Sequence, residues 1–483
     1  MAQNCGSMKN ILFYGDNLDI MREHGMDESV DLVYLDPPFN SQRNYNVLFK
    51  QAKKDENQAQ ITAFTDTWEW SKRRYDEFFD DARNARLFPL MNSLHDILGN
   101  SEMMAYLLMM APRLLELHRV LKPTGSLYLH CDPVASHYLK IVLDVVFGPQ
   151  HFINEITWKR TSGHPDAKRK FADVADILLT YAKSDGYKFS PQYKPYAEDY
   201  VGRFYNNADA DGRRVKRYLD EMPGMPAPNI WDDIKPVQPH SQERMGYPTQ
   251  KPLALLDRII NASSSPGDMV LDPFCGCGTA VVAAEKLGRR WIGIDITHVA
   301  LDLMIARLAE NFGLKRDQDY DVLGDPKDAH SAHKLFEQSP KQFEIWAVGL
   351  VAGVPQPEKS GDRGVDGKVY FMDLEEKLQF AVVQVKGGNL TPGVLRDFAH
   401  VIGRDRAAMG FFICLATPTK GMYREADELR FFESPSGRKI PKLQIRTIKE
   451  LLEGKEFDFP KGYSLKSAGR KLIRDGEQTQ MEM

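Results

Sequence analysis

Apolar residues along this chain follow two recurring patterns. Short apolar runs rich in β-branched and aromatic residues predict strands, and apolar residues spaced three and four positions apart predict helices. Their repeated alternation, with short turns that contain glycine, predicts an α/β fold with a doubly wound, largely parallel sheet. The predicted strands cover residues 11–15, 30–36, 125–130, 268–272 and 290–295, the predicted helices cover 16–24, 101–121, 251–263, 281–288 and 298–313, and the alternation continues over 137–183.

Two segments interrupt this alternation. Residues 51–100 are predicted to be a polar, aromatic-bearing insertion. Between residues 186 and 250 prolines recur, aromatic residues are scattered, and a basic cluster stands at 213–217. We interpret 186–250 as an inserted recognition region rather than as part of the sheet.

The chain changes character again after the last predicted helix. Residues 321–333 are polar and show no periodicity, which predicts a linker. Residues 334–455 predict a separate, small α/β unit, and the basic and then polar tail over 461–483 is predicted to be disordered. The first seven residues precede a second methionine and are interpreted as an extension.

Composition narrows the class of protein. A length of 483 residues corresponds to roughly three domains, and 42% hydrophobic with 27% charged residues is typical of soluble globular proteins. The N-terminus has no apolar signal region, and apolar runs fall short of the ~18 residues of a membrane span, so we expect a cytoplasmic protein. The five scattered cysteines argue against a disulfide framework or structural zinc. A net charge of −4 neither indicates nor excludes a nucleic-acid partner.

The first candidate site is the segment VLDPFCGCGT over 270–279. A strand ends at Asp272, a loop with Gly276 and Gly278 follows, and a second strand ends 23 positions later at Asp295. Glycines let a ligand approach the backbone, and an acid at the end of the next strand suits a ribose diol. A nicotinamide dinucleotide is the alternative ligand. However, Val281 replaces the third glycine of such a site, which favours an adenosyl cofactor without a pyrophosphate.

The second candidate site is the strand end VYLDPPFN over 33–40. The lone pair of an exocyclic amine is delocalised into its ring. A carboxylate at Asp36 and a carbonyl at Pro37 that accept both N–H groups would localise the lone pair toward a methyl donor. Proline at 37 and 38 stiffens the loop. Phe39 offers a face on which a base rotated out of the duplex can stack.

Together the segments DPPF (36–39), GYPTQKP (246–252), DPFCGCGT (272–279) and GIDI (293–296) resemble the DNA amino-methyltransferases that use S-adenosylmethionine. Their order resembles the β class, whose Rossmann-like fold has circularly permuted motifs and an inserted target-recognition region. The resemblance covers residues 8–320. It implies base flipping, direct methyl transfer, and adenine N6 in preference to cytosine N4 as the target. Carbon-5 methylation is disfavoured because the chain contains no Pro-Cys dipeptide.

The same resemblance implies individual roles. It places the catalytic loop at Asp36, Pro37, Pro38 and Phe39. It implies cofactor contacts in three places, at Tyr14, Gly15, Asp16 and Asn17, at Lys251 and Pro252, and at Asp272, Phe274, Gly276, Gly278, Thr279 and Asp295. Double-stranded DNA would be the partner, and a homodimer is compatible with the class. Basic residues at 159–160, 168–170 and 213–217 could follow phosphates or could belong to solvated loops.

The C-terminal unit carries a third candidate site. Asp366 precedes a strand, and Gln384 and Lys386 share one face of the next, so an acid and an amide could hold Mg²⁺ while lysine orients water. This pattern resembles the Mrr-type branch of the PD-(D/E)xK nucleases, a restriction-endonuclease-like fold. The resemblance covers about 335–455 and assigns the second carboxylate to Glu344. Because glutamine replaces the usual acid, a domain that only grips DNA is the alternative.

The sequence therefore predicts a site-specific DNA adenine-N6 methyltransferase fused to an Mg²⁺-dependent endonuclease-like domain, acting in restriction–modification or defence. The alternative within this class is an orphan methyltransferase, for adenine N6 or cytosine N4, whose C-terminal domain only binds DNA. Two further readings are a nicotinamide-dependent oxidoreductase and a DNA-binding scaffold without activity. No GxxxxGK[ST] loop is present in the sequence, which argues against an ATP-driven translocase in this chain.

Overall fold

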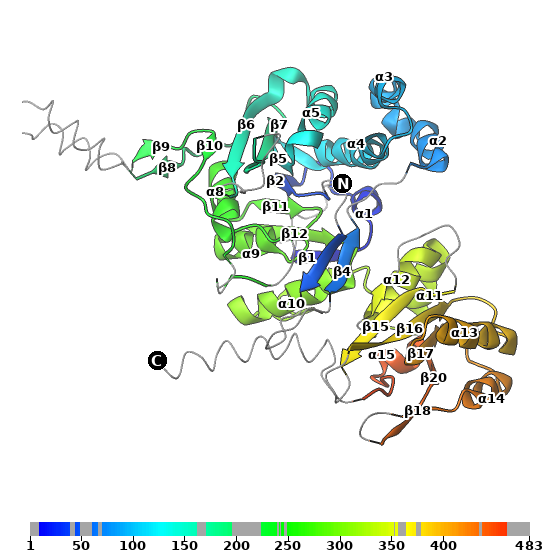
Figure 1. Cartoon of the computed structure of the whole chain (residues 1–483). Coiled ribbons are helices and arrows are strands. Elements are labelled where there is room, and N and C mark those ends of the chain that lie inside the picture. Colours follow the sequence, from blue (N-terminus) through cyan, green and yellow to red (C-terminus); the bar gives the residue numbers. More distant parts are fainter. Residues whose placement is uncertain are drawn as a thin grey trace, which may run out of the picture.

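The computed structural model arranges the first two thirds of the chain as a sheet covered by helices on both faces, followed by a smaller α/β unit (Figure 1). The residues that the structure describes are 9–38, 44–48, 60–65, 70–161, 171–195, 224–238, 241, 243–245, 249–351, 353–355, 364–372, 378–433 and 437–460.

The described residues of the first unit form a nine-stranded sheet in the order β10-β6-β7-β5-β2-β11-β12-β1-β13. All neighbours from β5 to β13 are parallel, and only β7 runs antiparallel to both of its neighbours. The predicted largely parallel sheet is thus confirmed. The strands are β1 (Asn10–Tyr14), β2 (Val30–Leu35), β5 (Leu121–Cys131), β6 (Phe152–Lys159), β7 (Ala175–Ala182), β10 (Ile230–Trp231), β11 (Met269–Asp272), β12 (Arg290–Asp295) and β13 (Tyr320–Leu323).

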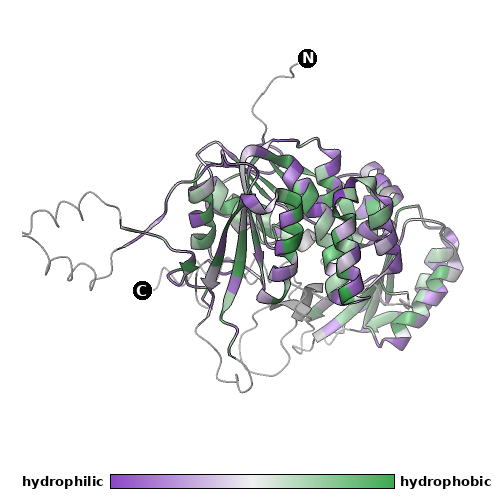
Figure 2. Cartoon of the chain, turned by 90° about the horizontal axis from the view of Figure 1, so that it is seen from above, coloured by the Kyte–Doolittle hydropathy of each residue, from purple (hydrophilic) through white to green (hydrophobic). Residues whose placement is uncertain are grey.

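Alternation along the strands divides the core between two helical layers. On β2, Leu32 and Tyr34 face one apolar cluster, while Val33 and Leu35 face the other. The helices carry both hydrophilic and hydrophobic residues, as expected for elements with one face toward the sheet and one toward solvent (Figure 2). One layer contains α8 (Leu253–Ser263), α9 (Thr279–Lys286) and α10 (His298–Phe312), and the other contains α1 (Asn17–Glu23), α4 (Glu102–Val120) and α5 (Pro133–Phe147).

Part of the predicted insertion folds as helices beside α4. Phe78 and Leu87 are buried against the layer that contains α4, which explains the aromatic residues of this polar segment. The elements here are α2 (Lys72–Asp80), the 3₁₀ helix η1 (Ala82–Leu87) and α3 (Phe88–Leu98), preceded by the strand pair β3 (Asn44–Leu48) and β4 (Gln60–Thr65).

The prediction of a linker over 321–333 is wrong. Residues 320–323 form β13, the edge strand of the main sheet, and bury Tyr320 and Val322. Helix α11 (Ala329–Gln338) begins soon after, with a capping box between Asp328 and Ser331. A four-residue strand is too short to show a period among polar neighbours, so the sequence pattern missed it.

The interpretation of 186–250 as lying outside the sheet also needs correction. Strand β10 pairs in parallel with β6 and extends the main sheet at one edge. Trp231 is buried there, with the guanidinium of Arg258 lying 5.0 Å from its ring centroid. The described short pair β8 (Tyr193–Lys194) and β9 (Met225–Pro226) stands apart from the main sheet.

The C-terminal unit has its own five-stranded sheet in the order β14-β15-β16-β17-β20. It packs against the first unit, because Trp346 and its neighbours belong to the same apolar cluster as Tyr320 and Val322. The Trp346 indole also donates a hydrogen bond of 3.1 Å to Asp325. The elements of the C-terminal unit are α12 (Pro340–Leu350), β14 (Val354–Pro355), β15 (Gly367–Met372), β16 (Leu378–Lys386), α13 (Pro392–Arg404), β17 (Met409–Cys414), α14 (Lys420–Glu428), β18 (Phe431–Glu433), β19 (Lys439–Pro441), β20 (Leu443–Thr447) and α15 (Ile448–Leu452).

Within the described residues, every helix is too short or too polar to cross a membrane.

Candidate active site

One cavity of about 680 Å³ opens at the carboxyl edge of the main sheet. Because β1, β2, β11 and β12 are all parallel, the loops that follow them meet at this edge. Asp36 after β2 and Asp272 at the end of β11 both line the cavity, although 236 positions separate them in the chain. The two motifs found in the sequence therefore meet in space.

Asp36 is the group from the DPPF loop that carries charge into this cavity. One of its oxygens, Oδ2, forms an ion pair with the Lys251 ammonium. The other, Oδ1, is buried and has no hydrogen-bond partner among the described residues. Pro37 and Pro38 line the cavity next to it, whereas the predicted Phe39 lies outside the described residues. A buried acceptor oxygen with no donor is suited to receive an N–H group of a ligand.

The loop after β11 is held in place by the acid that ends β12. The backbone N–H of Gly276 donates to Asp295 Oδ2 over 2.8 Å, and the N–H and hydroxyl of Thr297 donate to Oδ1. Gly278, at the start of α9, has a φ of 75°, and a Cβ there would lie 2.6 Å from Met304. Glycine is therefore required at 278 by conformation and by space.

Two carboxyl groups at this edge, those of Asp272 and Asp295, are buried, which makes their ionised forms unfavourable. Burial raises the pKa of the Asp272 carboxyl well above its ordinary value, and the nearby Asp36 and Asp295 raise it further. Burial also raises the pKa of Asp295, against the hydrogen bonds from Thr297 and Gly276. A cluster of this kind becomes more favourable when a cation enters it.

The loop after β1 contributes through a residue that the sequence analysis missed. Asp16 and Asn17 line the cavity, and Arg113 of α4 donates to both, over 2.7 Å and 2.6 Å. The Asn17 amide then donates to the Pro273 carbonyl over 2.6 Å, which joins this loop to the one after β11. The signal in the sequence was a single arginine within the apolar stretch 103–115. Tyr14 is buried behind the cavity rather than on its wall.

A buried chain of polar side chains runs from the cavity toward the surface. The Tyr34 hydroxyl lies 3.1 Å from His130 Nδ1, His130 Nε2 lies 3.1 Å from Asp176, and Arg160 pairs with Asp176 at 2.9 Å. A carboxylate accepts only, so His130 Nε2 carries a proton and donates to Asp176. Of the four residues in this chain, only Arg160 was predicted from the sequence as a functional residue, and there as a candidate phosphate contact.

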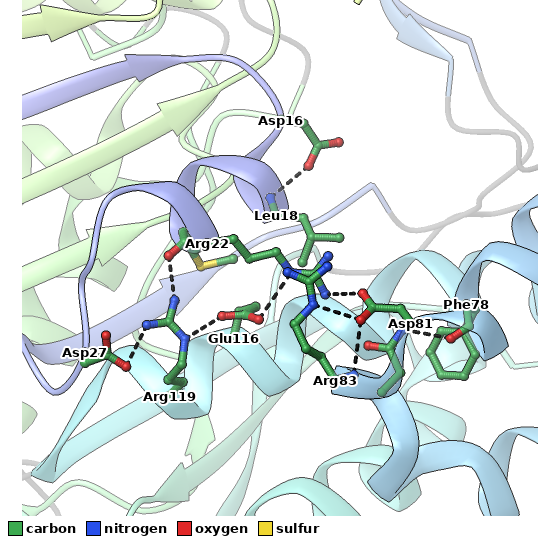
Figure 3. A network of polar contacts seen from close by, with 11 residues as sticks. Asp16, Leu18, Arg22, Asp27, Phe78, Asp81, Arg83, Glu116 and Arg119 are labelled. Atoms are coloured by element: carbon green, nitrogen blue, oxygen red, sulfur yellow. Dashed lines mark hydrogen bonds and ion pairs between the residues drawn. The ribbon is translucent and has the colours of Figure 1, made fainter. Parts of the chain in front are cut away.

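The helical wall of the cavity is fixed by a network of ion pairs (Figure 3). Arg22 of α1 pairs with Asp81 at 3.0 Å and with Glu116 at 3.2 Å. Glu116 also pairs with Arg119 at 2.6 Å, which pairs in turn with Asp27 at 2.8 Å. These contacts tie α1 and α4 to the segment that contains α2 and η1, so the insertion supplies a rigid side of the cavity.

The remaining predicted residues fall near this cavity or outside the described chain. Gly15, Phe274, Gly276, Thr279 and Lys251 line the cavity. Pro252 occupies the N-cap position of α8 and does not line the cavity. The predicted basic positions 168–170 and 213–217, and residues 246–248 of the GYPTQKP segment, lie outside the described residues, as do the predicted extension and the predicted tail.

The C-terminal candidate residues also come together. Asp366 Oδ2 accepts a hydrogen bond of 2.7 Å from the Val385 backbone, beside Gln384 and Lys386 on β16. Burial raises the pKa of Glu344 on α12, the charge of Asp366 raises it further, and Lys386 opposes this rise. Gln384 Oε1 is buried and has no hydrogen-bond partner in the described chain. No group of three His, Cys, Asp or Glu side chains within the described residues could hold a metal ion.

Comparison with known proteins shows that part of this chain matches a family profile. The N6/N4 methyltransferase family, described as "DNA methylase", matches residues 30–306. This segment contains both motif loops and the strands β2, β11 and β12, whereas β1 precedes it.

Individual relatives are similar over shorter stretches. The type II methyltransferase M.EcaI of Enterobacter cloacae is 29% identical over 42% of this chain and 58% of its own length. The DNA adenine methyltransferase YhdJ of Escherichia coli (strain K12) is 27% identical over 63% of this chain and 84% of its own. Among solved structures, the M1.HpyAVI-SAM complex is 18% identical, with a TM-score of 0.36, over 62% of this chain and 98% of that one. The chain spans between about half and two thirds of the length of the first relatives that it matches.

Proposed function

Because this chain belongs to the N6/N4 family of DNA methylases, we propose that it transfers the methyl group of S-adenosylmethionine to adenine N6 of a base flipped out of double-stranded DNA. The observation that carries this proposal is the meeting of Asp36 and the loop at 272–279 in one cavity. A relative named as a DNA adenine methyltransferase supports adenine as the target base.

The residues of the cavity fit the cofactor. S-adenosylmethionine supplies a methyl group on a positively charged sulfonium. Asp272 and Asp295 provide negative charge that burial and mutual repulsion make unfavourable without a cation. Gly276 offers a glycine backbone beside Asp295, which suits the close approach of an adenosyl group. The volume of about 680 Å³ falls within the usual range for such ligands.

On the base side, Asp36 is the residue that holds the target amine. Its buried Oδ1 accepts one N–H, and the Pro37 carbonyl accepts the other, so the nitrogen lone pair points toward the methyl donor. The methyl group moves from sulfur to nitrogen, a neutral thioether leaves, and the amine releases one proton. A fixed acceptor at the nitrogen stabilises the positive charge that develops during transfer.

The direct test is incubation of the purified chain with unmethylated plasmid and S-adenosylmethionine carrying a tritiated methyl group, followed by base-resolved mapping of methylation. We expect label in DNA and N6-methyladenine at one sequence motif. Label at cytosine N4 would correct the target base, and no label under any condition would contradict the proposal. Stabilisation against heat by NAD but not by S-adenosylmethionine would favour the oxidoreductase alternative.

For the C-terminal unit we propose Mg²⁺-dependent cleavage of DNA. Buried Gln384 Oε1 lacks a donor in the described chain, and Glu344 and Asp366 are close enough to raise the pKa of Glu344. An amide oxygen with two carboxylates is an oxygen ligand set suited to Mg²⁺. Lys386 would orient the attacking water or stabilise charge on phosphate.

Cleavage is tested by incubating unmethylated plasmid with Mg²⁺ and the chain, with and without Lys386→Ala. We expect the wild-type chain to nick or linearise the plasmid and the variant to lose this activity. Equal absence of cutting, with retention of the plasmid in a gel-shift assay, would favour a domain that only binds DNA.

A further inference from the structure

We propose that Lys251 is a positioning residue for Asp36 rather than a cofactor ligand. Its ammonium holds one oxygen of the carboxylate and leaves the other as the acceptor for the target amine. This inference rests on the proposed methyl transfer, but the ion pair itself can be tested without it.

The ion pair has the geometry that this role requires. Lys251 Nζ contacts Asp36 Oδ2, and both side chains are largely buried, with exposed fractions of 10% and 14%. Asp36 Oδ1 receives no hydrogen bond from any described residue. The two carboxylate oxygens are equivalent, so the ammonium fixes the orientation of the carboxylate plane: one oxygen stays at Lys251, and the other stays where no described donor reaches it. The carboxylate therefore presents a single, fixed acceptor.

Local hydrogen bonds hold the segments on both sides of Lys251. The Gln250 side chain accepts from the Met245 backbone over 2.8 Å and donates to the Glu243 carbonyl. The Glu243 carboxylate accepts from the backbone N–H of Leu253, at the start of α8. These bonds bracket Lys251 on both sides and hold its backbone against the helix. A side chain supported in this way is suited to orient another group.

Charge separates this role from a direct contact with the cofactor sulfonium. The charge of Lys251 lowers the pKa of Asp272 and Asp176, so the ammonium lies near one carboxylate that lines the cavity and one in the buried polar chain behind it. The sulfonium is also a cation and must come close to the base held by Asp36. Two like charges at such short range repel in a poorly solvated cavity. The ammonium is thus better placed to serve Asp36 than to bind the reactive end of the cofactor.

The first experiment separates methyl transfer from cofactor binding. Single-turnover transfer rates and dissociation constants for S-adenosylmethionine are measured for the wild type, Lys251→Met and Lys251→Arg. The matched control is Lys286→Met, which removes an exposed lysine of α9 that pairs with Asp257 of α8. We expect Lys251→Met to lower the rate by about 100-fold with less than about a threefold change in cofactor affinity, and Lys251→Arg to recover about tenfold.

A Lys251→Met rate within about threefold of the wild type would overturn the inference. Affinity for the cofactor that falls as much as the rate would also overturn it, because Lys251 would then be a cofactor ligand. A wild-type chain that transfers no methyl group would contradict the proposed function instead, and the second experiment would then decide.

The second experiment is a cycle of thermal midpoints for Lys251→Met, Asp36→Asn and the double variant. Removing one partner of a buried pair leaves the other uncompensated, so the effects of the two changes depend on each other. We expect the shift caused by Lys251→Met to differ by about 3 °C or more between the wild-type and Asp36→Asn backgrounds. Additive shifts would overturn the inference whether or not the chain methylates DNA.

Discussion

The cavity of the main sheet and the cluster on β16 share one feature. In each, an oxygen with no hydrogen-bond partner in the described chain is buried at a predicted site, Asp36 Oδ1 in the first and Gln384 Oε1 in the second. They differ in charge and in support. Asp36 is a carboxylate held by the Lys251 ammonium in a large cavity. Gln384 is a neutral amide on a strand, beside Asp366, which accepts from the backbone.

This difference indicates which ligand each region favours. The cavity is lined by six carboxylates against one lysine and three arginines, and this excess of negative charge suits a cationic cofactor next to a hydrogen-bond donor. The cluster on β16 has fewer acidic groups and suits a weakly held divalent cation. The two regions are thus alike in having one buried acceptor oxygen each and unlike in how much charge surrounds it.

The largest effect is expected for Asp36→Ala. Loss of the acceptor for the amine should lower methyl transfer by about 1,000-fold or more and change the affinity for S-adenosylmethionine by less than about threefold. Single-turnover assays and calorimetric titration measure the two quantities. Asp321→Ala, which removes an exposed carboxylate on β13, is the matched control. A variant that also loses cofactor binding would show that the roles of the two motifs are misassigned.

A smaller effect is expected for Arg113→Gln. Arg113 connects α4 to Asp16 and Asn17, so its loss should loosen the loop after β1 and weaken cofactor binding about 30-fold. Calorimetric titration with S-adenosylmethionine is the measurement. Arg290 begins β12, at the end of the strand opposite to the cavity, so Arg290→Gln should bind the cofactor like the wild type. Unchanged affinity in Arg113→Gln would mean that the loop is held by other contacts.

Asp272→Asn should separate stability from binding. The pKa of Asp272 is higher in the folded than in the unfolded chain. The free energy of unfolding therefore falls as pH rises above the unfolded-state pKa of about 3.9, because the unfolded chain releases this proton first. The amide removes this cost, so the variant should have a higher thermal midpoint at pH 7 and a smaller advantage at pH 4. Its affinity for S-adenosylmethionine should fall about tenfold. Equal midpoints at pH 7 would contradict the proposed charge repulsion.

The smallest effect is expected for Gln384→Glu, which makes the second region more like the first. A third carboxylate beside Glu344 and Asp366 should increase the affinity for Mg²⁺ by about three- to tenfold. The rise of the thermal midpoint with added Mg²⁺ measures this change even in a chain that does not cut DNA. A variant with no greater response to Mg²⁺ than the wild type would argue against a metal site there.

Local features of the sequence were sufficient to predict much of the fold. The apolar periods and the glycine and proline positions determine the strands β1, β2, β11 and β12, and each of the four motif residues Tyr14, Asp36, Asp272 and Asp295 ends or directly follows one of them. Parallel order then brings these strand ends to one edge. The meeting of the two motifs was therefore predictable, and the structure confirms it.

Contacts between distant residues were less accessible to prediction. The ion pair of Lys251 with Asp36 joins residues 215 positions apart, and no periodicity encodes which of several nearby carboxylates a lysine meets. Arg113 reaches Asp16 from a helix whose pattern indicated only a buried face. Strand β13 was missed because its polar surroundings hide two buried residues, Tyr320 and Val322.

The apolar cluster that continues from the main sheet into α12 affects how this protein can be dissected. A gene shortened to end at residue 320 would remove Val322 and Trp346 from the packing around Tyr320 and expose a hydrophobic surface on the part that remains. The C-terminal unit, expressed alone, would lose the complementary surface. We expect neither fragment to keep the stability and activity that it has in the intact molecule. Activities are therefore better assigned with point variants of the whole chain.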